Sequence, residues 1–173
     1  ELPDNILGDP DAPVTMIEYS SMTCPHCARF HTGVLGDFKK KYIDTGKVKY
    51  IIREFPLDNL ATAAFMLARC AGPDKYFPFV DALYAQQEKW AFVEKPVEPL
   101  RELAKQAGFT RETFDKCLKD QKLVDGILWI RKRGADEFKV SATPTFFING
   151  RKLKGSSSIE GLSAVIDPLL KDS

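Results

Sequence analysis

Short runs of apolar residues at the two ends of the chain predict strands. Residues 14–20 follow a proline, residues 48–55 precede one, and both runs are rich in β-branched and aromatic side chains. A third apolar run covers residues 145–148. Asn149-Gly150 follows it, which is typical of a two-residue hairpin turn, so residues 151–154 are predicted to return as a paired strand.

Between these runs the pattern predicts helices. The first continues through residues 28–35 toward Tyr42. Gly72-Pro73 is a stop signal for another helix, and Thr110 is a candidate N-cap. Gly126 and Gly134 make a continuous helix over residues 121–138 less favourable, because glycine disfavours a helix interior. The remaining helices are predicted over residues 59–71, 79–90, 100–107, the segment after Thr110 that carries Phe114 to Leu118, 121–138 and 159–170.

The order of these elements predicts an α/β protein in two halves. A strand–helix–strand unit comes first, and the right-handed crossover rule makes its two strands parallel. A block of helices follows, and the chain ends as strand–strand–helix. We find no internal repeat or low-complexity tract in the 173 residues.

The most informative residues are Cys24-Pro25-His26-Cys27, between the first strand and its helix. A cysteine at a helix N-terminus lies where unpaired backbone N–H groups and the helix dipole favour negative charge. The thiolate is the reactive form of cysteine, so this position favours redox chemistry. His26 could add positive charge when protonated, and Pro25 suits the first helical turn because its missing N–H has no intrahelical partner there.

Other uses of a Cys-x-x-Cys pair fit the sequence less well. Structural zinc needs four ligands, yet Cys70 and Cys117 are isolated, and both histidines of the chain, His26 and His31, lie beside the motif. Haem attachment would require histidine at position 28, which is alanine. A purely structural disulfide stays open as an alternative, although so short a loop constrains the unfolded chain little.

Composition adds few constraints. The formal net charge is +1, which gives no indication of a nucleic-acid partner. No apolar run is long enough to cross a membrane. The sequence begins at Glu1 without a signal peptide, which fits either an exported protein after processing or a shortened chain. Four cysteines fit two pairs in an oxidising compartment.

The motif in this context resembles the DsbA family of bacterial periplasmic thiol:disulfide oxidoreductases, which have a thioredoxin fold with a helical insertion between the βαβ and ββα halves. The resemblance extends from about Gly8 to Leu170. It implies a thioredoxin-like domain of residues 1–57 and 140–173 and an inserted helical domain of residues 58–139. The matching stretches are Ile17 to Cys27, Phe55-Pro56-Leu57 and Thr143-Pro144-Thr145-Phe146.

The resemblance implies roles for the matching residues. Cys24 would be the exposed nucleophile and Cys27 the buried resolving thiol. Pro144 would be cis and face both cysteines, where the preceding backbone can pair with an extended peptide. The Thr143 hydroxyl could then hydrogen-bond a thiolate, or Thr143 could simply flank a strand. A buried Glu18 would have a raised pKa and could exchange protons with Cys27, whereas in an alternating strand it would face solvent.

Cys70 and Cys117 fall in the predicted insertion. A bridge between them would close a loop of nearly fifty residues and would contribute roughly 4 kcal/mol in the chain-entropy model. Two separate buried thiols are the alternative. We favour the bridge, because an oxidising compartment penalises unpaired thiols.

The resemblance favours a dithiol oxidase that acts through the Cys24–Cys27 disulfide without a further cofactor or metal. It implies a monomeric, exported, periplasmic protein whose substrates are reduced, unfolded proteins, together with a quinone-linked membrane reoxidase of the DsbB type. At the position before the cis proline, Thr143 resembles bacterial disulfide isomerases, whereas the best-known oxidases have valine at this position. An isomerase or reductase is therefore the second hypothesis, and a non-catalytic binding module is the third.

Overall fold

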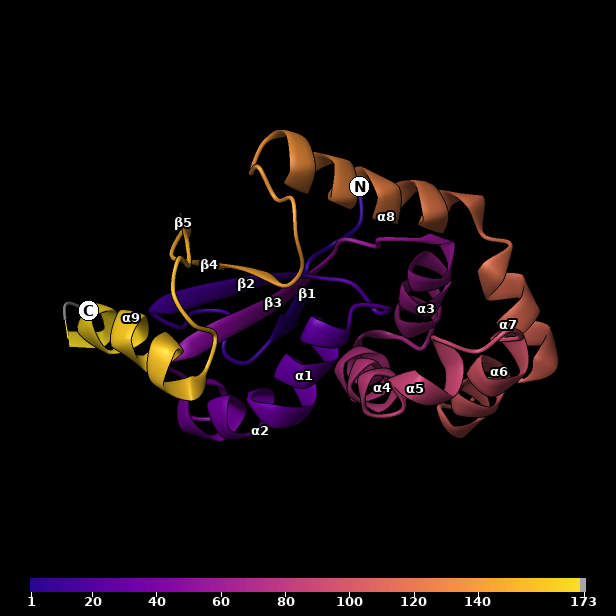
Figure 1. Cartoon of the computed structure of the whole chain (residues 1–173), viewed down its shortest axis with the longest axis horizontal. Coiled ribbons are helices and arrows are strands. Elements are labelled where there is room, and N and C mark those ends of the chain that lie inside the picture. The colour runs from indigo at the N-terminus through magenta and orange to yellow at the C-terminus, as the bar shows by residue number, and fades with distance from the viewer. Residues whose placement is uncertain (172–173) are drawn as a thin grey trace.

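A five-stranded sheet organises the computed structural model, which describes residues 1–171 (Figure 1). The strand order is β1-β3-β2-β4-β5. β2 and β3 are parallel, as the crossover rule predicts, and every other neighbouring pair is antiparallel. The strands are β1 (Asn5–Leu7), β2 (Val14–Ser20), β3 (Val48–Glu54), β4 (Thr145–Ile148) and β5 (Arg151–Lys152).

Strand β1 is the one strand that the sequence pattern did not predict. It has three residues, which is too short to show alternation, and it pairs along the outer edge of β3, from Asn5 opposite Ile52 to Leu7 opposite Tyr50. The predicted return strand is shorter than expected, because β5 ends at Lys152. Strand β3 ends one residue before Phe55.

Helices cover both faces of the sheet. Successive residues of a strand point to opposite faces. Met16 and Glu18 of β2 lie on the face covered by α1 (Pro25–Gly33), whereas Tyr19 lies on the face covered by α8 (Gln121–Asp136) (Figure 1). α2 (Leu35–Phe38), the π-helical turn η1 (Lys39–Ile43) and α9 (Ile159–Lys171) complete the layer beside α1.

The sequence predicted one helix that continues toward Tyr42, but the structure divides this segment into α1, α2 and η1. Val34 leaves helical geometry, with φ −123°, and divides α1 from α2. Gly33 precedes this residue and Gly36 follows it, and neither glycine favours a helix interior. The chain therefore turns after the redox motif's helix rather than continuing straight.

The helical block between β3 and β4 is present, with different internal boundaries. The helix predicted to start at Phe79 starts at Pro73, so Pro78 lies inside it, on the exposed side. Gly72-Pro73 ends one helix and begins the next, whereas the sequence analysis used it only as a stop signal. The helices are α3 (Asn59–Cys70), α4 (Pro73–Ala85), α5 (Gln87–Trp90), α6 (Val97–Gln106), α7 (Arg111–Leu118) and α8.

Helix α8 is continuous through both of its glycines. A Cβ atom at Gly134 would lie 2.6 Å from the Tyr19 ring, and one at Gly126 would lie 2.6 Å from the Leu2 side chain. These close approaches explain why glycine is present despite its low helix propensity. Thr110 caps α7 as predicted, and its side chain accepts the N–H of Thr113.

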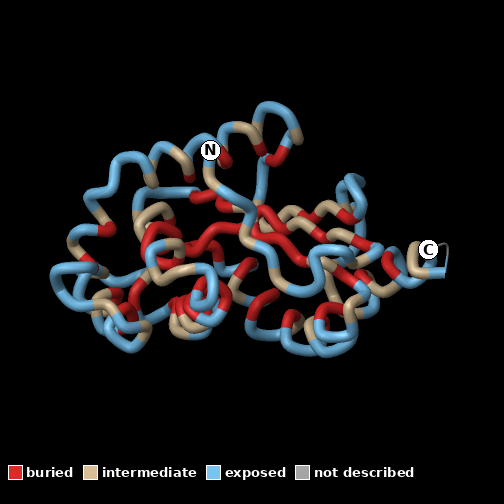
Figure 2. The backbone as a smooth tube through the Cα atoms, turned by 180° about the vertical axis from the view of Figure 1, so that it is seen from behind, coloured by how far each residue is buried: buried red, intermediate tan, exposed pale blue. Residues whose placement is uncertain are grey.

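A large hydrophobic core joins the sheet to the helical block, and a second, smaller cluster around Tyr19, Phe55 and Val140 lies on the α8 side of the sheet. The large core contains Met16 and Tyr50 from the sheet, Phe65 from α3 and Phe114 from α7. The buried stretches run through the strands and into the surrounding helices (Figure 2). The division into domains of residues 1–57 with 140–173 and 58–139 stays a prediction. No helix within residues 1–171 is long and apolar enough to span a membrane.

A buried carboxylate at the end of β3 ties the sheet to the helical block. Glu54 is fully buried, and its two oxygens accept hydrogen bonds from Arg69 of α3 at 2.6 and 2.8 Å. Tyr76 of α4 and Asn5 of β1 each donate to it at 3.1 Å. Four elements therefore meet at one negative charge.

We expect Arg69→Met to lower the free energy of unfolding by about 3–5 kcal/mol, because it leaves the Glu54 charge buried without its cation. Urea denaturation measures the change. Lys39→Met is the control, because Lys39 and its partner Asp44 are both about half exposed and such a surface pair contributes at most about 1 kcal/mol. Equal losses in the two variants would contradict the role of Arg69.

Candidate redox site

The thiol of Cys24 caps the N-terminus of α1. Cys24 has extended backbone geometry, Pro25 is the first helical residue, and the Cys24 sulfur accepts the Cys27 backbone N–H at 3.3 Å. Buried Gln87 of α5 fixes the preceding loop, since its amide donates to the carbonyl oxygens of Met22 and Cys24 at 2.9 and 3.0 Å. The sequence analysis did not identify Gln87, because its contact depends on the folding of a distant helix.

Cys24 is more enclosed than expected, whereas Cys27 is buried as expected. Cys24 is only 5% exposed, so the expectation that it is exposed is wrong, while its role as the nucleophile stays a prediction; Cys27 is completely buried. Cys24 is still the more accessible of the two. The Cys24 sulfur lies at the helix N-terminus, and Cys27 lies one turn further into the core.

The environments of the two thiols separate their pKa values. The pKa of Cys24 is lowered to about 5, chiefly by a hydrogen bond from the Cys27 thiol, with further donation from Thr143 and from the backbone N–H groups of Cys27 and His26. These donors outweigh the opposing effect of burial. Burial raises the pKa of Cys27, and the negative charges of Cys24 and Glu18 raise it further. At neutral pH the pair therefore holds a Cys24 thiolate beside a protonated Cys27.

Thr143 and Pro144 face the motif from the start of β4. The peptide bond between them is cis, and the Cys24 thiol lies 3.5 Å from the Thr143 carbonyl oxygen. The Thr143 hydroxyl oxygen is buried and has no hydrogen-bond partner among residues 1–171. It can therefore donate to the Cys24 sulfur once that sulfur is ionised, and this is the donation from Thr143 that lowers the Cys24 pKa.

His26 is exposed, and its ring nitrogen Nδ1 contacts the Arg29 guanidinium. The contribution of His26 to the Cys24 pKa comes from its backbone N–H. The charge expected from its ring stays a prediction.

Glu18 lies on the buried side of β2, so the solvent-facing alternative is wrong. One oxygen, Oε1, lies 2.9 Å from His31 Nε2 and also accepts from the Tyr50 hydroxyl. The sequence analysis overlooked His31 as a functional residue. The available signal was spacing, since His31 comes four residues after Cys27 and so shares its face of α1.

The buried His31 is a cation at neutral pH. Burial lowers its pKa, but the charge of Glu18, its hydrogen bond to His31 Nε2 and the charge of Asp81, 3.6 Å from Nδ1, outweigh burial and raise the pKa to about 9. Glu18 is thus half of a buried ion pair rather than a lone carboxyl group.

The second pair of cysteines is bonded. Cys70 at the end of α3 and Cys117 in α7 form a disulfide with a Cα–Cα distance of 6.2 Å. It joins two helices of the helical block and leaves Cys24 and Cys27 as the free thiols among residues 1–171. An effect of this bridge on the redox potential stays a prediction.

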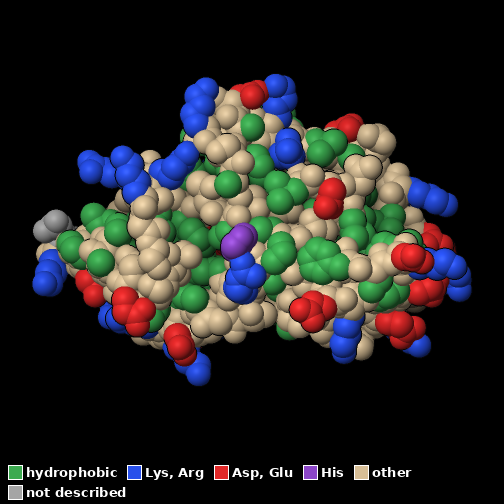
Figure 3. Space-filling model, in the orientation of Figure 1, with side chains coloured by type: hydrophobic (Ala, Val, Ile, Leu, Met, Phe, Trp, Pro, Cys, Tyr) green, Lys and Arg blue, Asp and Glu red, His purple; other side chains and the backbone are tan. Residues whose placement is uncertain are grey.

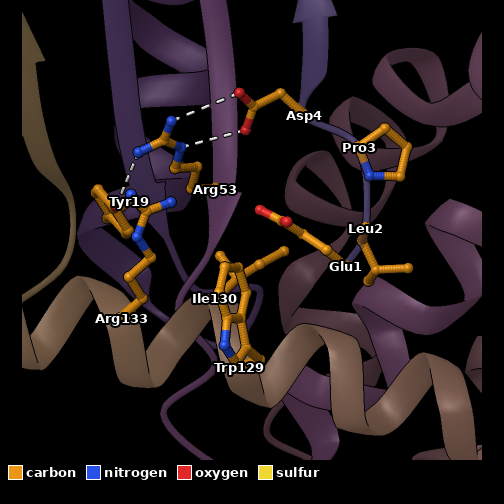
Figure 4. A pocket seen from close by; sticks show the side chains of 9 residues that line it. All are labelled: Glu1, Leu2, Pro3, Asp4, Tyr19, Arg53, Trp129, Ile130 and Arg133. Atoms are coloured by element: carbon orange, nitrogen blue, oxygen red, sulfur yellow. Dashed lines mark hydrogen bonds and ion pairs between the residues drawn. The ribbon is translucent and has the colours of Figure 1, made fainter.

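A separate cavity of about 400 Å³ lies between the N-terminal segment, β3 and α8 (Figure 4). It contains no thiol. Arg53 is matched there by Asp4 and donates to the Tyr19 hydroxyl, while Trp129 and Arg133 line the α8 side. Because Tyr19 and Glu18 are adjacent in β2, this cavity is on the opposite face of the sheet from the Glu18–His31 pair.

The amino-acid sequence is similar to those of known thioredoxin-like proteins, in agreement with the fold and the two-cysteine site. A family model described as Thioredoxin matches residues 2–168. A Rickettsia bellii protein named "Putative protein-disulfide oxidoreductase" is 36% identical over 171 residues, which cover 98% of this chain and 66% of that protein. A Rickettsia felis protein of the same name is 35% identical, and the match covers 98% of this chain and 61% of that protein. The chain thus spans just under two thirds of these curated relatives.

Solved structures show the same fold. The crystal structure of Wolbachia pipientis alpha-DsbA1 matches with a TM-score of 0.92 and 35% identity, covering 99% of this chain and 94% of that one. Oxidised BdbD from Bacillus subtilis matches with a TM-score of 0.85 and 24% identity over 97% and 93% of the two chains, which supports the fold alone. The sheet, the inserted helices and the two-cysteine site define a thioredoxin-superfamily protein. Within that superfamily, the chain belongs to the DsbA family. The predicted fold class is confirmed.

We expect Thr143→Val to raise the pH at which Cys24 ionises by about one unit, because it removes a hydroxyl that stabilises the thiolate. One unit corresponds to about 1.4 kcal/mol, close to the lower end for hydrogen bonds to charged groups. Thiolate absorbance near 240 nm during a pH titration measures this change. An unchanged midpoint would show that the hydroxyl makes no contact with the thiolate.

His31 also predicts a pH-dependent stability. A pKa raised from 6.5 to about 9 on folding contributes stability that is complete below pH 6.5 and is lost as pH rises through 9. We expect a loss of about 3 kcal/mol over this range. Denaturation of the oxidised protein, in which Cys24 and Cys27 do not titrate, measures it. His31→Gln should lose this slope, and an equal slope in that variant would assign the effect to another group.

Proposed function

We propose that this protein is a thiol:disulfide oxidoreductase that acts as a dithiol oxidase and donates its Cys24–Cys27 disulfide to reduced proteins. The observation that carries the proposal is the stabilised Cys24 thiolate at the N-terminus of α1. A stabilised thiolate favours the reduced form of the protein, so the disulfide becomes a stronger oxidant.

The proposed reaction has two exchange steps. A substrate thiolate attacks the Cys24 sulfur, the Cys24–Cys27 bond breaks, and Cys27 leaves as a thiolate that takes up a proton. The second substrate thiolate then attacks the substrate sulfur of the mixed disulfide, and Cys24 leaves as a thiolate. The substrate gains a disulfide and the protein gains two electrons. The second step is favoured because a sulfur of low pKa is a good leaving group.

The surface supports a reduced, unfolded protein as the substrate. Hydrophobic side chains gather across the middle of one face of the molecule, with charged groups mainly around its margins (Figure 3). Leu57, Phe92 and Val97 are each about half exposed. The backbone around Thr143 and cis Pro144 lies next to the Cys24 sulfur, where an extended peptide could pair with it.

Continued turnover requires an oxidant that restores the disulfide. In the proposal this is a quinone-linked membrane protein of the DsbB type, the protein works as a monomer in the bacterial periplasm, and no further cofactor takes part. The family supports these assignments. The buried free pair Cys24–Cys27 also needs an oxidising compartment if it is to persist as a disulfide.

An isomerase or reductase of the same fold is the second candidate, and Thr143 is the observation that favours it. A hydroxyl that stabilises the Cys24 thiolate also favours the reduced protein, which is the form that attacks incorrect disulfides.

We expect the oxidised protein to form the disulfide of a reduced two-cysteine peptide stoichiometrically. Cys24→Ala and Cys27→Ala should fall to the uncatalysed rate, because neither can hold the reactive disulfide. Mass spectrometry of acid-quenched samples measures the product. The double variant Cys70→Ala/Cys117→Ala is the matched control, because it also removes a pair of sulfurs but keeps the Cys24–Cys27 pair.

Two outcomes would contradict the oxidase. No acceleration over background by the wild-type protein would favour a non-catalytic module. Reactivation of a scrambled protein by reduced Cys27→Ala, without oxidation by the wild type, would favour an isomerase.

A further inference from the structure

A second carboxylate extends the buried Glu18–His31 ion pair toward the protein surface. His31 lies between two carboxylates: its Nε2 is 2.9 Å from Glu18 Oε1, and its Nδ1 is 3.6 Å from Asp81 Oδ1. The His31 side chain is 1% exposed, whereas the Asp81 side chain is 55% exposed. Asp81 is thus the first member of this series that reaches solvent.

Packing holds the His31 ring in this position. Tyr84 of α4 stacks on it with a centroid distance of 4.3 Å, and Phe30 packs edge-on at 5.6 Å. The Tyr50 hydroxyl of β3 lies 3.5 Å from Nε2. The ring therefore presents one nitrogen to Glu18 and the other to Asp81.

Cys27 requires a proton that it cannot take directly from solvent. It is completely buried, and its pKa is raised, so it must be protonated soon after it leaves the disulfide. The negative charge of Glu18 is one of the causes that raise the Cys27 pKa, so this carboxylate lies within electrostatic reach of the thiol. The second Glu18 oxygen, Oε2, is buried and has no hydrogen-bond partner in residues 1–171, so it is free to carry a proton.

We propose that His31 and Asp81 are positioning residues that connect Cys27 to solvent by a proton route through Glu18. The proposal rests on the proposed dithiol–disulfide exchange at Cys24–Cys27. Asp81 belongs to no motif in the sequence, and it lies on a helix more than fifty residues after Cys27.

The number of protons gained and lost along the route balances each time Cys27 is reduced or oxidised. When Cys27 leaves as a thiolate, Glu18 passes it a proton received from the His31 imidazolium, and His31 regains a proton from solvent beside Asp81. Reoxidation runs the same transfers in reverse. The titratable groups that face His31 are Glu18 of β2, Tyr50 of β3, and Asp81 and Tyr84 of α4, while Cys27 lies one turn away on α1.

The first test is Asp81→Asn, which keeps the size of an exposed side chain and so leaves folding intact. We expect reaction with dithiothreitol to slow by about tenfold between pH 6 and 7, in both reduction and reoxidation, and the slope of the rate with pH to change. A single step of general acid–base catalysis contributes roughly 10²–10⁴-fold, and solvent water would replace part of this route. Asp74→Asn, on the exposed side of the same helix, is the control and should stay within about twofold of the wild type.

The second measurement follows the His31 ring by nitrogen NMR, which is tractable because the chain has two histidines. We expect the His31 titration to shift when Cys24–Cys27 is reduced and to shift again in Asp81→Asn. Identical pH–rate profiles for Asp81→Asn and wild type, or a His31 ring that does not respond to the redox state, would overturn the route. Dithiothreitol reacts whichever direction the protein prefers, so failure of the oxidase assignment alone would leave this result unchanged.

Discussion

The hydrogen bonds to the Cys24 sulfur are the interaction on which the site depends. The sulfur accepts the N–H that any helix N-terminus leaves unpaired, and the Cys27 thiol donates to it as well. A helix cap normally contributes stability alone. Here the cap is the reacting atom, so oxidation of the pair changes the capping group of α1 as well as the redox state.

The rest of the fold supplies the surroundings for that cap. Gln87 of α5 fixes the loop before Cys24, and β4 brings Thr143 to the other side of the sulfur. Beneath the helix, the Glu18–His31 pair places charge near Cys27, and Glu54 with Arg69 ties the same sheet to α3. The helical block is therefore part of the site, because it supplies Gln87, Tyr84 and Asp81.

The sequence allowed prediction of the features that depend on local pattern. Strands β2 and β3, the hairpin turn at Asn149-Gly150 and the start of α1 at Pro25 follow from apolar runs, turn residues and capping. Most of the errors come from tertiary context, and the missed strand β1 is the exception. β1 is too short to show a pattern, and Pro78 is tolerated inside α4 because it lies on the exposed side. The ion pair of Glu18 with His31 requires α1 to pack against β2, and the contact of Gln87 requires a helix that is distant in the chain.

The equilibrium between the Cys24–Cys27 disulfide and glutathione tests the central claim most directly. A Cys24 thiolate stabilised as the geometry indicates should give a potential well above that of thioredoxin, which is about −270 mV, and toward about −120 mV, the value of a strong oxidase. Each 30 mV of that difference corresponds to roughly 1.4 kcal/mol in favour of the reduced protein. A potential close to that of thioredoxin would contradict the account, because the contacts to Cys24 would then not stabilise the reduced form.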